Sequence, residues 1–532
     1  MVSFILFLEI TRTQSIAALL VLLPLFFLGS VLVLGAQLKV DRNDGFQPYP
    51  LIGHLPQFLA NRHRIMDWMT EELARQPGCT LVFRRLGDVP GVITANPANV
   101  EHILRAGFDN FPKGPRHVSM LHDFLGRGIF NVDGEAWRVQ RKAASYEFTT
   151  RSLRVFVAQS VHLELHSRLL PLLRRAVRSG HLIDLQDTLE RYAFDNICRV
   201  AFDHDPRQLP DDGDAKSDSR STGTASRRFA DSFHDAANLS VGRFRYALPG
   251  FWKIKKALNL GSERRLSESI AMVHGYADRI IRSRREEMSK QGWEKHDLLS
   301  RFMASQSDNY SETALRDVVI SFLLAGRETT SSALTWFFWL LSSRPDVESR
   351  IRDEVAAVRA RRTHGHGDVD SKVGFDLDEL REMHYVHAAV TESLRLYPPV
   401  PVNSLNVQAA DVLLDGTAVR PGWFMSYNSY AMGRMESIWG EDAKEFRPER
   451  WLDKAEGTLF RPQSPFRYVA FHAGPRICIG KEMAYIQMKS IVASVLEELE
   501  LEVDGGYSPR QVPSLTLRMA EGLPVRVKAR VN

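Results

Sequence analysis

Near its C-terminus the sequence reads Phe471-His-Ala-Gly-Pro-Arg-Ile-Cys-Ile-Gly480, and this stretch decides the fold. It sets one cysteine in a glycine-flanked loop, and a run of helix formers, Lys481 to Met488, follows directly. Glycines let the backbone turn tightly, so that its N–H groups point at the sulfur. These hydrogen bonds and the start of the following helix are expected to lower the thiol pKa. Such a loop suits axial thiolate ligation of a haem iron, in which an electron-rich sulfur favours O–O cleavage.

A lone cysteine is more often a small core hydrophobe than a ligand. Here, however, five positions share one pattern, Phe-x-x-Gly-x-Arg-x-Cys-x-Gly, which makes that alternative improbable. The pattern resembles the haem-binding signature of the cytochrome P450 superfamily. The resemblance implies haem b as the cofactor, with Cys478 as the iron ligand and Arg476 at a haem propionate. It also places three further residues in the cofactor-binding loop: Phe471, Gly474 and Gly480.

The composition is that of an ordinary globular protein with a large core, since 44% of the 532 residues are hydrophobic. The net charge of +5 is mild and spread along the chain, so it does not indicate nucleic-acid binding. It is compatible with an anionic membrane surface or an acidic protein partner. The other two cysteines, Cys79 and Cys198, are widely spaced. The three together therefore predict no disulfide framework, as expected in a reducing compartment.

An apolar segment near the N-terminus predicts membrane attachment. Ile16–Ala36 holds 21 residues without a charge, and as a helix it would span about 31 Å, which matches the hydrocarbon core of a bilayer. The segment is too long for the apolar region of a signal peptide, so an uncleaved anchor is favoured. We therefore predict an anchor at 1–38, a proline-containing hinge at 39–60 and a catalytic domain at 61–532. The flanking charges do not fix the orientation.

From Arg64 onward the pattern is mainly helical. Short β-type runs are predicted at Thr80–Phe83, Gly91–Thr94, Asp411–Leu414, Ser514–Arg518 and Pro524–Val527. Two polar stretches, Asp205–Arg228 and Arg359–Gly374, read as surface insertions, and the first is expected to be a flexible loop. The His364-Gly-His366 pair in the second has no nearby partners and is assigned no function.

The longest predicted helix runs from about Glu312 to Ser342, with Ser311 as its N-cap. It is apolar enough for a membrane span, but charges at its centre favour a buried helix in a large soluble domain. That centre, Ala325-Gly-Arg-Glu-Thr-Thr330, sets an acid, Glu328, beside an alcohol, Thr329. Gly326 would allow close approach of a ligand or a local distortion. A helix hydroxyl more often bonds to the carbonyl one turn back. Beside the cysteine loop, however, the segment resembles the oxygen-activating helix of the same superfamily, which implies a proton relay through Glu328 and Thr329.

Two further motifs occur in the superfamily's order. Glu392 and Arg395 lie three residues apart on one predicted helix face, and Arg450 follows in a Pro-Glu-Arg segment. Taken alone such a pair is usually exposed and weak. By resemblance, these three residues form a structural lock behind the haem and serve folding rather than catalysis.

Trp137 and Arg141 match the superfamily's Trp-x-x-x-Arg motif, which implies contacts with haem propionates. Taken alone, this motif would usually be a surface arginine over a packed aromatic ring. Many members also carry a basic residue shortly after the Pro398–Pro401 run. Here residues 404–406 are the neutral Ser-Leu-Asn, which leaves one propionate without its usual support.

The resemblance covers essentially the whole chain and implies a mainly α P450 fold with a small β subdomain. It is closest to the plant fatty-acid ω-hydroxylase clan, and within it to the family numbered 94, as indicated by Phe111-Pro-Lys-Gly114 and Phe124-Leu-Gly-Arg-Gly-Ile-Phe130. It implies a monooxygenase of the endoplasmic reticulum membrane, facing the cytosol. Electrons would come from NADPH–cytochrome P450 reductase, since the chain has no dinucleotide fingerprint of its own.

The substrate is expected to be a lipid-like acid. Hydroxylation of a fatty acid at or near the ω carbon is the first interpretation, and oxidation of jasmonoyl–isoleucine is the alternative within the family. Residues that shape the pocket are predicted at Lys113–Phe124, around Phe322, at Val400–Leu405 and at Pro513–Leu517. Two other classes remain: a haem-thiolate isomerase or dehydratase, against which the Glu328–Thr329 pair argues, and a non-catalytic haem-binding membrane sensor.

Overall fold

The structure is a computed structural model. It describes residues 46–49, 52–86, 89–209, 219–246, 250–291, 297–304, 311–364, 374–453, 455 and 457–530. The chain divides into two compact units, one containing residues 1–65 and 83–89, the other residues 66–82 and 90–532. The predicted anchor at Ile16–Ala36 lies outside the described residues. Among the helices that are described, none combines the length and the hydropathy that crossing a bilayer requires.

The first unit contains α2 (Leu55–Ala60), a short helix within the segment predicted as a hinge. The ring of His54 stacks on Phe46, with their centroids 4.1 Å apart. Its Nδ1 accepts a hydrogen bond of 3.0 Å from the backbone N–H of Arg84. Burial lowers the pKa of His54, so the ring is neutral and can accept this bond.

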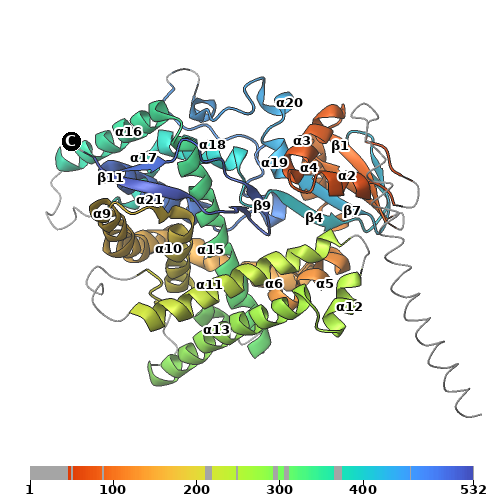
Figure 1. The fold of residues 1–532 in the computed structure, drawn as a ribbon, viewed down its shortest axis with the longest axis horizontal. Coiled ribbons are helices and arrows are strands. Elements are labelled where there is room, and N and C mark those ends of the chain that lie inside the picture. Colours follow the sequence, from red (N-terminus) through yellow and green to blue (C-terminus); the bar gives the residue numbers. More distant parts are fainter. Residues whose placement is uncertain are drawn as a thin grey trace, which may run out of the picture. The chain divides into compact units, whose positions relative to one another are not determined.

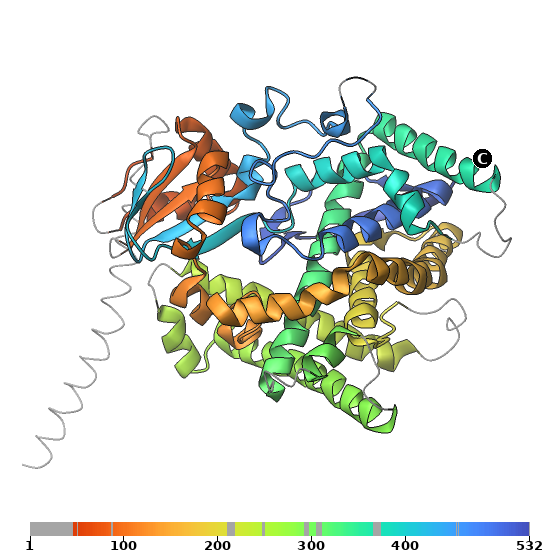
Figure 2. The same ribbon diagram turned by 180° about the vertical axis from the view of Figure 1, so that it is seen from behind.

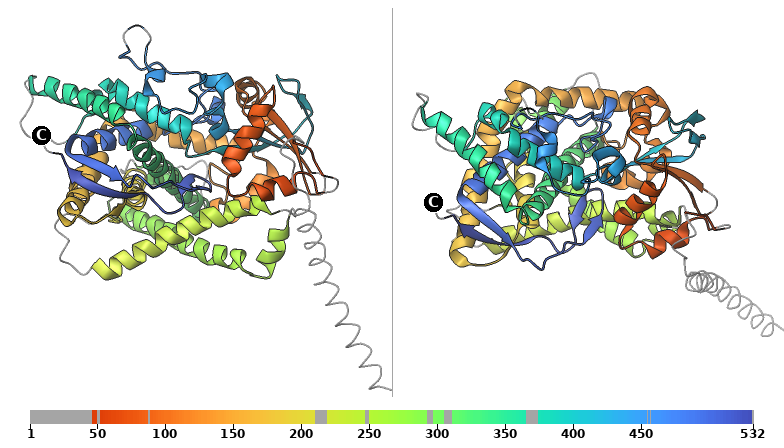
Figure 3. Two further views of the ribbon diagram at one scale, coloured as in Figure 1. Left: turned by 45° about the horizontal axis from the view of Figure 1, so that its top comes forward. Right: turned by 90° about the horizontal axis from the view of Figure 1, so that it is seen from above.

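The second unit is mainly helical, which confirms the predicted fold class (Figure 1). Its α-helices are α3 (Ile65–Arg75), α4 (Pro97–Glu101), α5 (Gly114–Leu125), α6 (Gly134–Ser145), α7 (Thr150–Val155), α8 (His162–Glu164), α9 (Leu170–Ser179), α10 (Leu185–Phe202), α11 (Ser219–Gly242), α12 (Phe251–Ala257), α13 (Ser262–Gln291), α14 (Leu298–Ala304), α15 (Glu312–Leu341), α16 (Pro345–His364), α17 (Leu377–Glu382), α18 (His384–Leu396), α19 (Ser429–Met432), α20 (Glu436–Trp439) and α21 (Lys481–Glu498). A π-helical turn, η1 (His102–Ala106), follows α4. The long helices α11 and α13 lie side by side (Figure 3).

The strands form small sheets. They are β1 (Thr80–Arg85), β2 (Val89–Thr94), β3 (Ile183–Asp184), β4 (Val402–Asn406), β5 (Asp411–Val412), β6 (Ala418–Val419), β7 (Phe424–Asn428), β8 (Leu499–Val503), β9 (Gln511–Pro513), β10 (Leu517–Met519) and β11 (Pro524–Ala529). The largest sheet has the order β1-β2-β7-β4, in which β2 and β7 are parallel and β4 and β7 antiparallel. Asn406 pairs with Phe424 at the end of the β4–β7 ladder.

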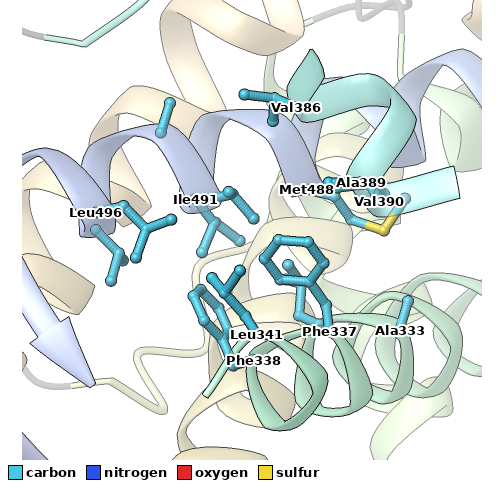
Figure 4. Packing of buried hydrophobic residues seen from close by; sticks show 14 of the residues in the cluster. Ala333, Phe337, Phe338, Leu341, Val386, Ala389, Val390, Met488, Ile491 and Leu496 are labelled. Carbon is cyan, nitrogen blue, oxygen red and sulfur yellow. The ribbon is translucent and has the colours of Figure 1, made fainter. Parts of the chain in front are cut away.

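Helix α15 crosses the second unit and joins two hydrophobic cores (Figures 1 and 2). It begins where the Ser311 hydroxyl accepts a hydrogen bond from the Ala314 N–H, as predicted. Its first half packs with α5, α10, α11 and α13. Its second half packs with α18 and α21 in the other core, which contains Phe337, Leu341, Val386 and Ile491 (Figure 4). The stretch 325–332 between the two halves belongs to neither core.

Some sequence predictions of local structure were wrong. The polar segment Asp205–Arg228 is not a loop throughout, because α11 begins at Ser219 and continues into the buried Phe229 and Phe233. The predicted strand Ser514–Arg518 is mostly the turn between β9 and β10. In both cases contacts with distant parts of the chain determine where the helix or strand begins. The local composition therefore does not predict these boundaries.

Candidate functional site

Backbone hydrogen bonds within the cysteine loop hold its shape, and the loop packs against η1. The Cys478 N–H donates to the Phe471 carbonyl at 2.9 Å, and the Ile477 N–H donates to the Gly474 carbonyl at 3.0 Å. Gly474 has a φ of +65°, and a Cβ there would lie 2.0 Å from the Leu104 carbonyl oxygen. A side chain at this position would therefore push the loop off η1. Helix α21 starts directly after the loop, as predicted.

The Cys478 side chain keeps accessible surface, and neighbouring groups of the protein nevertheless act on the pKa of its thiol. Burial raises the pKa of the thiol, and the opposing effects of the Gly480 amide, Arg141 and Lys481 do not outweigh it. The sequence expectation of a lowered pKa was therefore wrong in its net direction, because the loop is more deeply enclosed than a surface turn.

The arginines of the predicted propionate site gather around one aromatic ring, and one of them binds a carboxylate. The Arg476 and Arg141 guanidinium carbons lie 4.6 and 5.7 Å from the centroid of the buried Trp137 ring. Arg476 Nη2 donates to Asp133 Oδ1 at 2.6 Å. Arg141 Nη2 donates to the Ile477 carbonyl at 2.7 Å, which joins α6 to the cysteine loop. The motifs from α6 and from the loop thus meet in space.

Two histidines beside these cations are held neutral. Burial and the neighbouring Lys113 lower the pKa of His472 to about 3. Burial likewise holds the pKa of His117 well below its usual value, and its Nδ1 is enclosed without a hydrogen-bond partner. Lys113 itself is enclosed by protein beside Arg476, and burial lowers its pKa to about 8. The cluster therefore owes its charge at neutral pH to the lysine and the arginines.

One face of α15 is open where the two cores separate. Between positions 317 and 338 every residue is buried except Ala325, Gly326 and Thr329, which share a helix face and keep accessible surface. The Thr329 hydroxyl donates to the Ala325 carbonyl at 2.5 Å, one turn back along the helix. A Cβ at Gly326 would lie 2.4 Å from Ile197 Cγ1, so this glycine is required by the close approach of α10.

Glu328 is directed elsewhere, into a buried polar cluster. Its carboxylate pairs with Arg327 and accepts a hydrogen bond of 3.4 Å from the Thr516 hydroxyl. Burial alone would raise the pKa of Glu328, but Arg327 and Arg518 outweigh it and the net pKa is lowered. Glu190 completes the cluster, because its carboxylate pairs with both Arg327 and Arg518. The acid is therefore ionised at neutral pH and bound away from the Thr329 hydroxyl.

The structure brings together the three residues of the predicted lock. Arg395 Nη2 and Nε donate to the two carboxylate oxygens of Glu392 at 2.7 and 2.8 Å. Arg450 Nε donates to the same carboxylate at 3.3 Å, and Trp451 Nε1 donates at 2.8 Å. Glu392 and Arg395 are both buried, so this pair is not one of the weak exposed pairs.

These groups fit haem b. The Cys478 side chain keeps accessible surface, and so do Ala325 and Thr329 on one face of α15 within the same unit. Asp133 is the one carboxylate of a described residue that acts on Lys113 and Arg476, and no carboxylate of a described residue acts on Arg141. A thiolate for the iron and surplus positive charge for two propionates are what this cofactor needs.

Comparison with known proteins agrees with this chemistry. The family model described as Cytochrome P450 matches residues 44–523. The chain belongs to the cytochrome P450 family. It is 50% identical to Cytochrome P450 CYP94D108 of Paris polyphylla, over 90% of each chain. It is 42% identical to Cytochrome P450 94A1 of Vicia sativa, over 91% of this chain and 90% of the relative, and 42% identical to Cytochrome P450 94B1 of Arabidopsis thaliana, over 97% and 98%.

The P450 is therefore a monooxygenase with haem b as its cofactor, and it works with O2, a small-molecule substrate and a reductase that supplies electrons. Sequence motifs found most of the residues around the cofactor loop. They missed Asp133, whose carboxylate binds Arg476 and the N–H groups of Lys113 and Gly114. Its only local signal is its place just before α6, where acidic residues are common helix caps.

Proposed function

We propose that this P450 hydroxylates a fatty acid at or near its ω carbon, as a membrane-anchored enzyme that receives electrons from NADPH–cytochrome P450 reductase. Its similarity to members of family 94 supports the substrate class, because the sequence resembles the ω-hydroxylase clan. One structural observation carries the preference for an acid: a partly buried arginine in α5, without a carboxylate partner among the described residues.

That arginine is Arg116, in the first turn of α5. Its guanidinium carbon lies 5.7 Å from the centroid of the Phe424 ring, which covers one side of it. Burial lowers its pKa, and no charged group of the described residues adds to that effect. A guanidinium in this setting gains from a carboxylate that binds it with two hydrogen bonds. We expect the substrate carboxylate to bind here, with the hydrocarbon chain extending away from it.

Positioning must then select the last carbon. A terminal methyl C–H bond is stronger than the neighbouring methylene C–H bonds, so intrinsic reactivity favours the wrong position. A fatty acid whose carboxylate is fixed presents one defined carbon to the reaction centre. The substrate is therefore oriented before the reaction, and this orientation supplies the selectivity. Chain length should therefore decide which carbon is oxidised.

Bound through Cys478, haem b would supply the oxygen-activating chemistry. The Thr329 hydroxyl lies on the open face of α15 and can turn from the Ala325 carbonyl to hold a proton at Oγ1. Because Glu328 is ionised, it has no proton of its own to donate. It would first accept a proton and then pass it on. To do so its carboxylate must leave Arg327 or Thr516. We propose that these two residues relay protons in that order, from Glu328 to Thr329.

Membrane attachment remains a proposal, since the predicted anchor lies outside the described residues. An exposed patch supports it. Helix α12 and the residues after it carry large apolar side chains in solvent, and lysines interleave with them. The apolar residues are Phe251, Ile254, Leu258 and Leu260. Exposed apolar groups combined with lysines are typical of a surface that lies on an anionic bilayer. We propose the endoplasmic reticulum membrane, with the catalytic domain in the cytosol.

A spectral binding screen tests the substrate proposal. Fatty acids of 12 to about 18 carbons, their methyl esters and jasmonoyl–isoleucine are titrated into the ferric holoenzyme, and products are identified after turnover with reductase and NADPH. The acids should bind about tenfold or more tightly than their esters, since a hydrogen-bonded charge contact is worth about 1.5–3 kcal/mol. Arg116→Gln should remove that difference.

Arg138→Gln serves as the matched control, because Arg138 is an exposed arginine of α6 paired with Glu135. It should leave the preference for acids unchanged. Equal binding of acid and ester by the wild-type enzyme would refute the anchor. Turnover of jasmonoyl–isoleucine without turnover of any fatty acid would replace the proposed substrate by the hormone conjugate. Substrate binding without NADPH consumption would indicate a haem-binding sensor.

A further inference from the structure

Glu328 has no proton of its own to donate, so the proposed relay needs a further source. The residue is buried, with 3% of its surface exposed, and solvent does not reach it directly. Burial would raise its pKa, but the pKa is held low by Arg327, Arg518, His234 and the Thr516 hydroxyl. Arginines and threonine hydroxyls do not release protons near neutral pH. Burial lowers the pKa of His234 to about 4, so its ring is neutral and holds no acidic proton.

Glu190 of α10 is the acid that shares both arginines with Glu328. Arg327 Nη2 donates to Glu190 Oε2 at 2.8 Å, and the neighbouring Nη1 donates to Glu328. Arg518 Nη2 donates to the other oxygen of Glu190, and its charge also acts on Glu328. Two carboxylates on adjacent nitrogens of one guanidinium lie close together. A single water, or a rotation of one side chain, is then enough to connect them for proton transfer.

The two carboxylates differ in their affinity for a proton. Burial raises the pKa of Glu190 to about 7, although Arg327 and Arg518 oppose this effect. The negative charges of Glu328 and Asp187 act in the same direction as burial. When two acids interact closely, one keeps its proton while the other ionises. Glu190 therefore carries a proton in a substantial fraction of the molecules at neutral pH, while Glu328 is ionised.

Glu190 also lies one helical turn from an acid that solvent reaches. Asp187 precedes it by three positions on α10, so the two side chains share a helix face. The Asp187 side chain is 49% exposed and pairs with Arg191 at 2.8 Å. Its charge acts on Glu190. A proton taken up from solvent at Asp187 can therefore be passed to Glu190 within the same helix.

We propose that Glu190 donates the proton that Glu328 passes to Thr329. The proton leaves the carboxylic acid of Glu190 and binds to the carboxylate of Glu328, so one negative charge moves to Glu190 and stays beside the two arginines. Glu190 then takes up a new proton from solvent beside Asp187. Because Glu190 acts through Glu328, it is a positioning residue for the reaction. The inference rests on the proposed relay from Glu328 to Thr329.

Glu190→Gln in the full-length holoenzyme tests this role. Coupling, the product formed per NADPH consumed, is measured across neutral pH with dodecanoic acid, or with jasmonoyl–isoleucine should the spectral screen select it. Wild-type coupling should fall as the pH rises through about 7, because Glu190 then loses its proton. In Glu190→Gln it should be about 10-fold lower and no longer depend on pH in this range. A donor one step from the reaction contributes less than the roughly 10²–10⁴-fold of a direct one.

Infrared difference spectra give a second readout, which does not depend on turnover. The carbonyl stretch of a protonated buried carboxylic acid should disappear as the pH rises through neutrality, and Glu190→Gln should lack this contribution. Asp195→Asn is the matched control, because burial raises the pKa of this α10 acid to about 7 as well. Asp195 accepts from the N–H groups of Gln208 and Leu209 and, in the described part of the chain, shares no arginine with Glu328. Asp195→Asn should lose its own band and keep wild-type coupling.

Wild-type coupling at every pH in Glu190→Gln, or an infrared spectrum identical to that of the wild type, would overturn the inference. Glu328→Gln separates this result from failure of the relay. If Glu328→Gln uncouples the reaction and Glu190→Gln does not, only the donor is refuted; if neither does, the relay and its donor are both refuted. Should Glu190→Gln yield no holoprotein, Glu190→Asp decides. A shorter acid should move the midpoint of the pH profile, and an unchanged midpoint would overturn the inference.

Discussion

Replacing Arg395 by alanine should prevent accumulation of folded holoprotein. The Arg395 guanidinium donates five hydrogen bonds, two to Glu392 and one each to the carbonyls of Gly433, Ala443 and Glu445. Alanine would leave the buried Glu392 carboxylate without its main counter-charge and three carbonyls without this donor. Breaking a buried pair costs about 3–5 kcal/mol, against a net stability of roughly 5–15 kcal/mol for a folded protein.

At one factor of ten per 1.4 kcal/mol, this loss raises the unfolded-to-folded ratio about 10²–10³-fold or more. The assay is the yield of protein with the thiolate-type ferrous–CO band per total chain, followed by urea unfolding of whatever folds. Arg395→Lys should also fail, because lysine cannot present two parallel donors to a carboxylate.

The control is Glu268→Ala. Glu268 pairs with Arg264 at 3.0 Å on the surface of α13, where both side chains are more than half exposed. Exposed pairs of this kind contribute about 0.2–1 kcal/mol, so its yield and unfolding midpoint should match those of the wild type. Normal yield of haem-loaded Arg395→Ala would refute the reasoning, since it would mean that the buried carboxylate does not depend on its partner.

Three other perturbations have distinct outcomes. Cys478→Ser should lose the red-shifted ferrous–CO band, and retention of both the band and full turnover would contradict thiolate ligation. Thr329→Ala should keep haem but divert NADPH oxidation toward peroxide, with coupled product formation reduced about 10²–10⁴-fold; unchanged coupling would make the hydroxyl purely structural. Gly326→Ala should destabilise the protein by about 1–3 kcal/mol through its clash with Ile197. Adding Ile197→Ala should recover much of that loss in urea unfolding, and no recovery would place the strain elsewhere.

The sequence predicted the mainly α fold and the long central helix because both rest on local patterns. The N-cap at Ser311 and the apolar run after it are visible in the chain itself. The same holds for Glu392 and Arg395, whose spacing alone puts them on one helix face. The strands β4 and β7 were not predicted, since strands of five residues carry little signal and depend on pairing across the sheet.

Charge compensation and burial were hardest to predict. No pattern in the sequence indicates that Asp133 joins Arg476, which lies more than three hundred residues later. The pKa of Cys478 was misjudged for the same reason, because enclosure depends on elements from the whole unit. Gly326 was expected to allow close approach of a ligand or a local distortion, and the structure adds a reason for the glycine that the sequence did not indicate, the close approach of Ile197 on α10.

The separation between the two halves of the haem site has a consequence for biosynthesis. Lys113, Asp133 and Arg141 are translated about 340 to 365 residues before Cys478, a delay of about 15–75 s at typical rates of synthesis. During that interval Lys113, Asp133 and Arg141 are present without Arg476 and without the loop that would hold the iron. The nascent chain therefore cannot complete its cofactor site until almost all of it has been made, and haem capture is a late event, coupled to closure of the cysteine loop against η1.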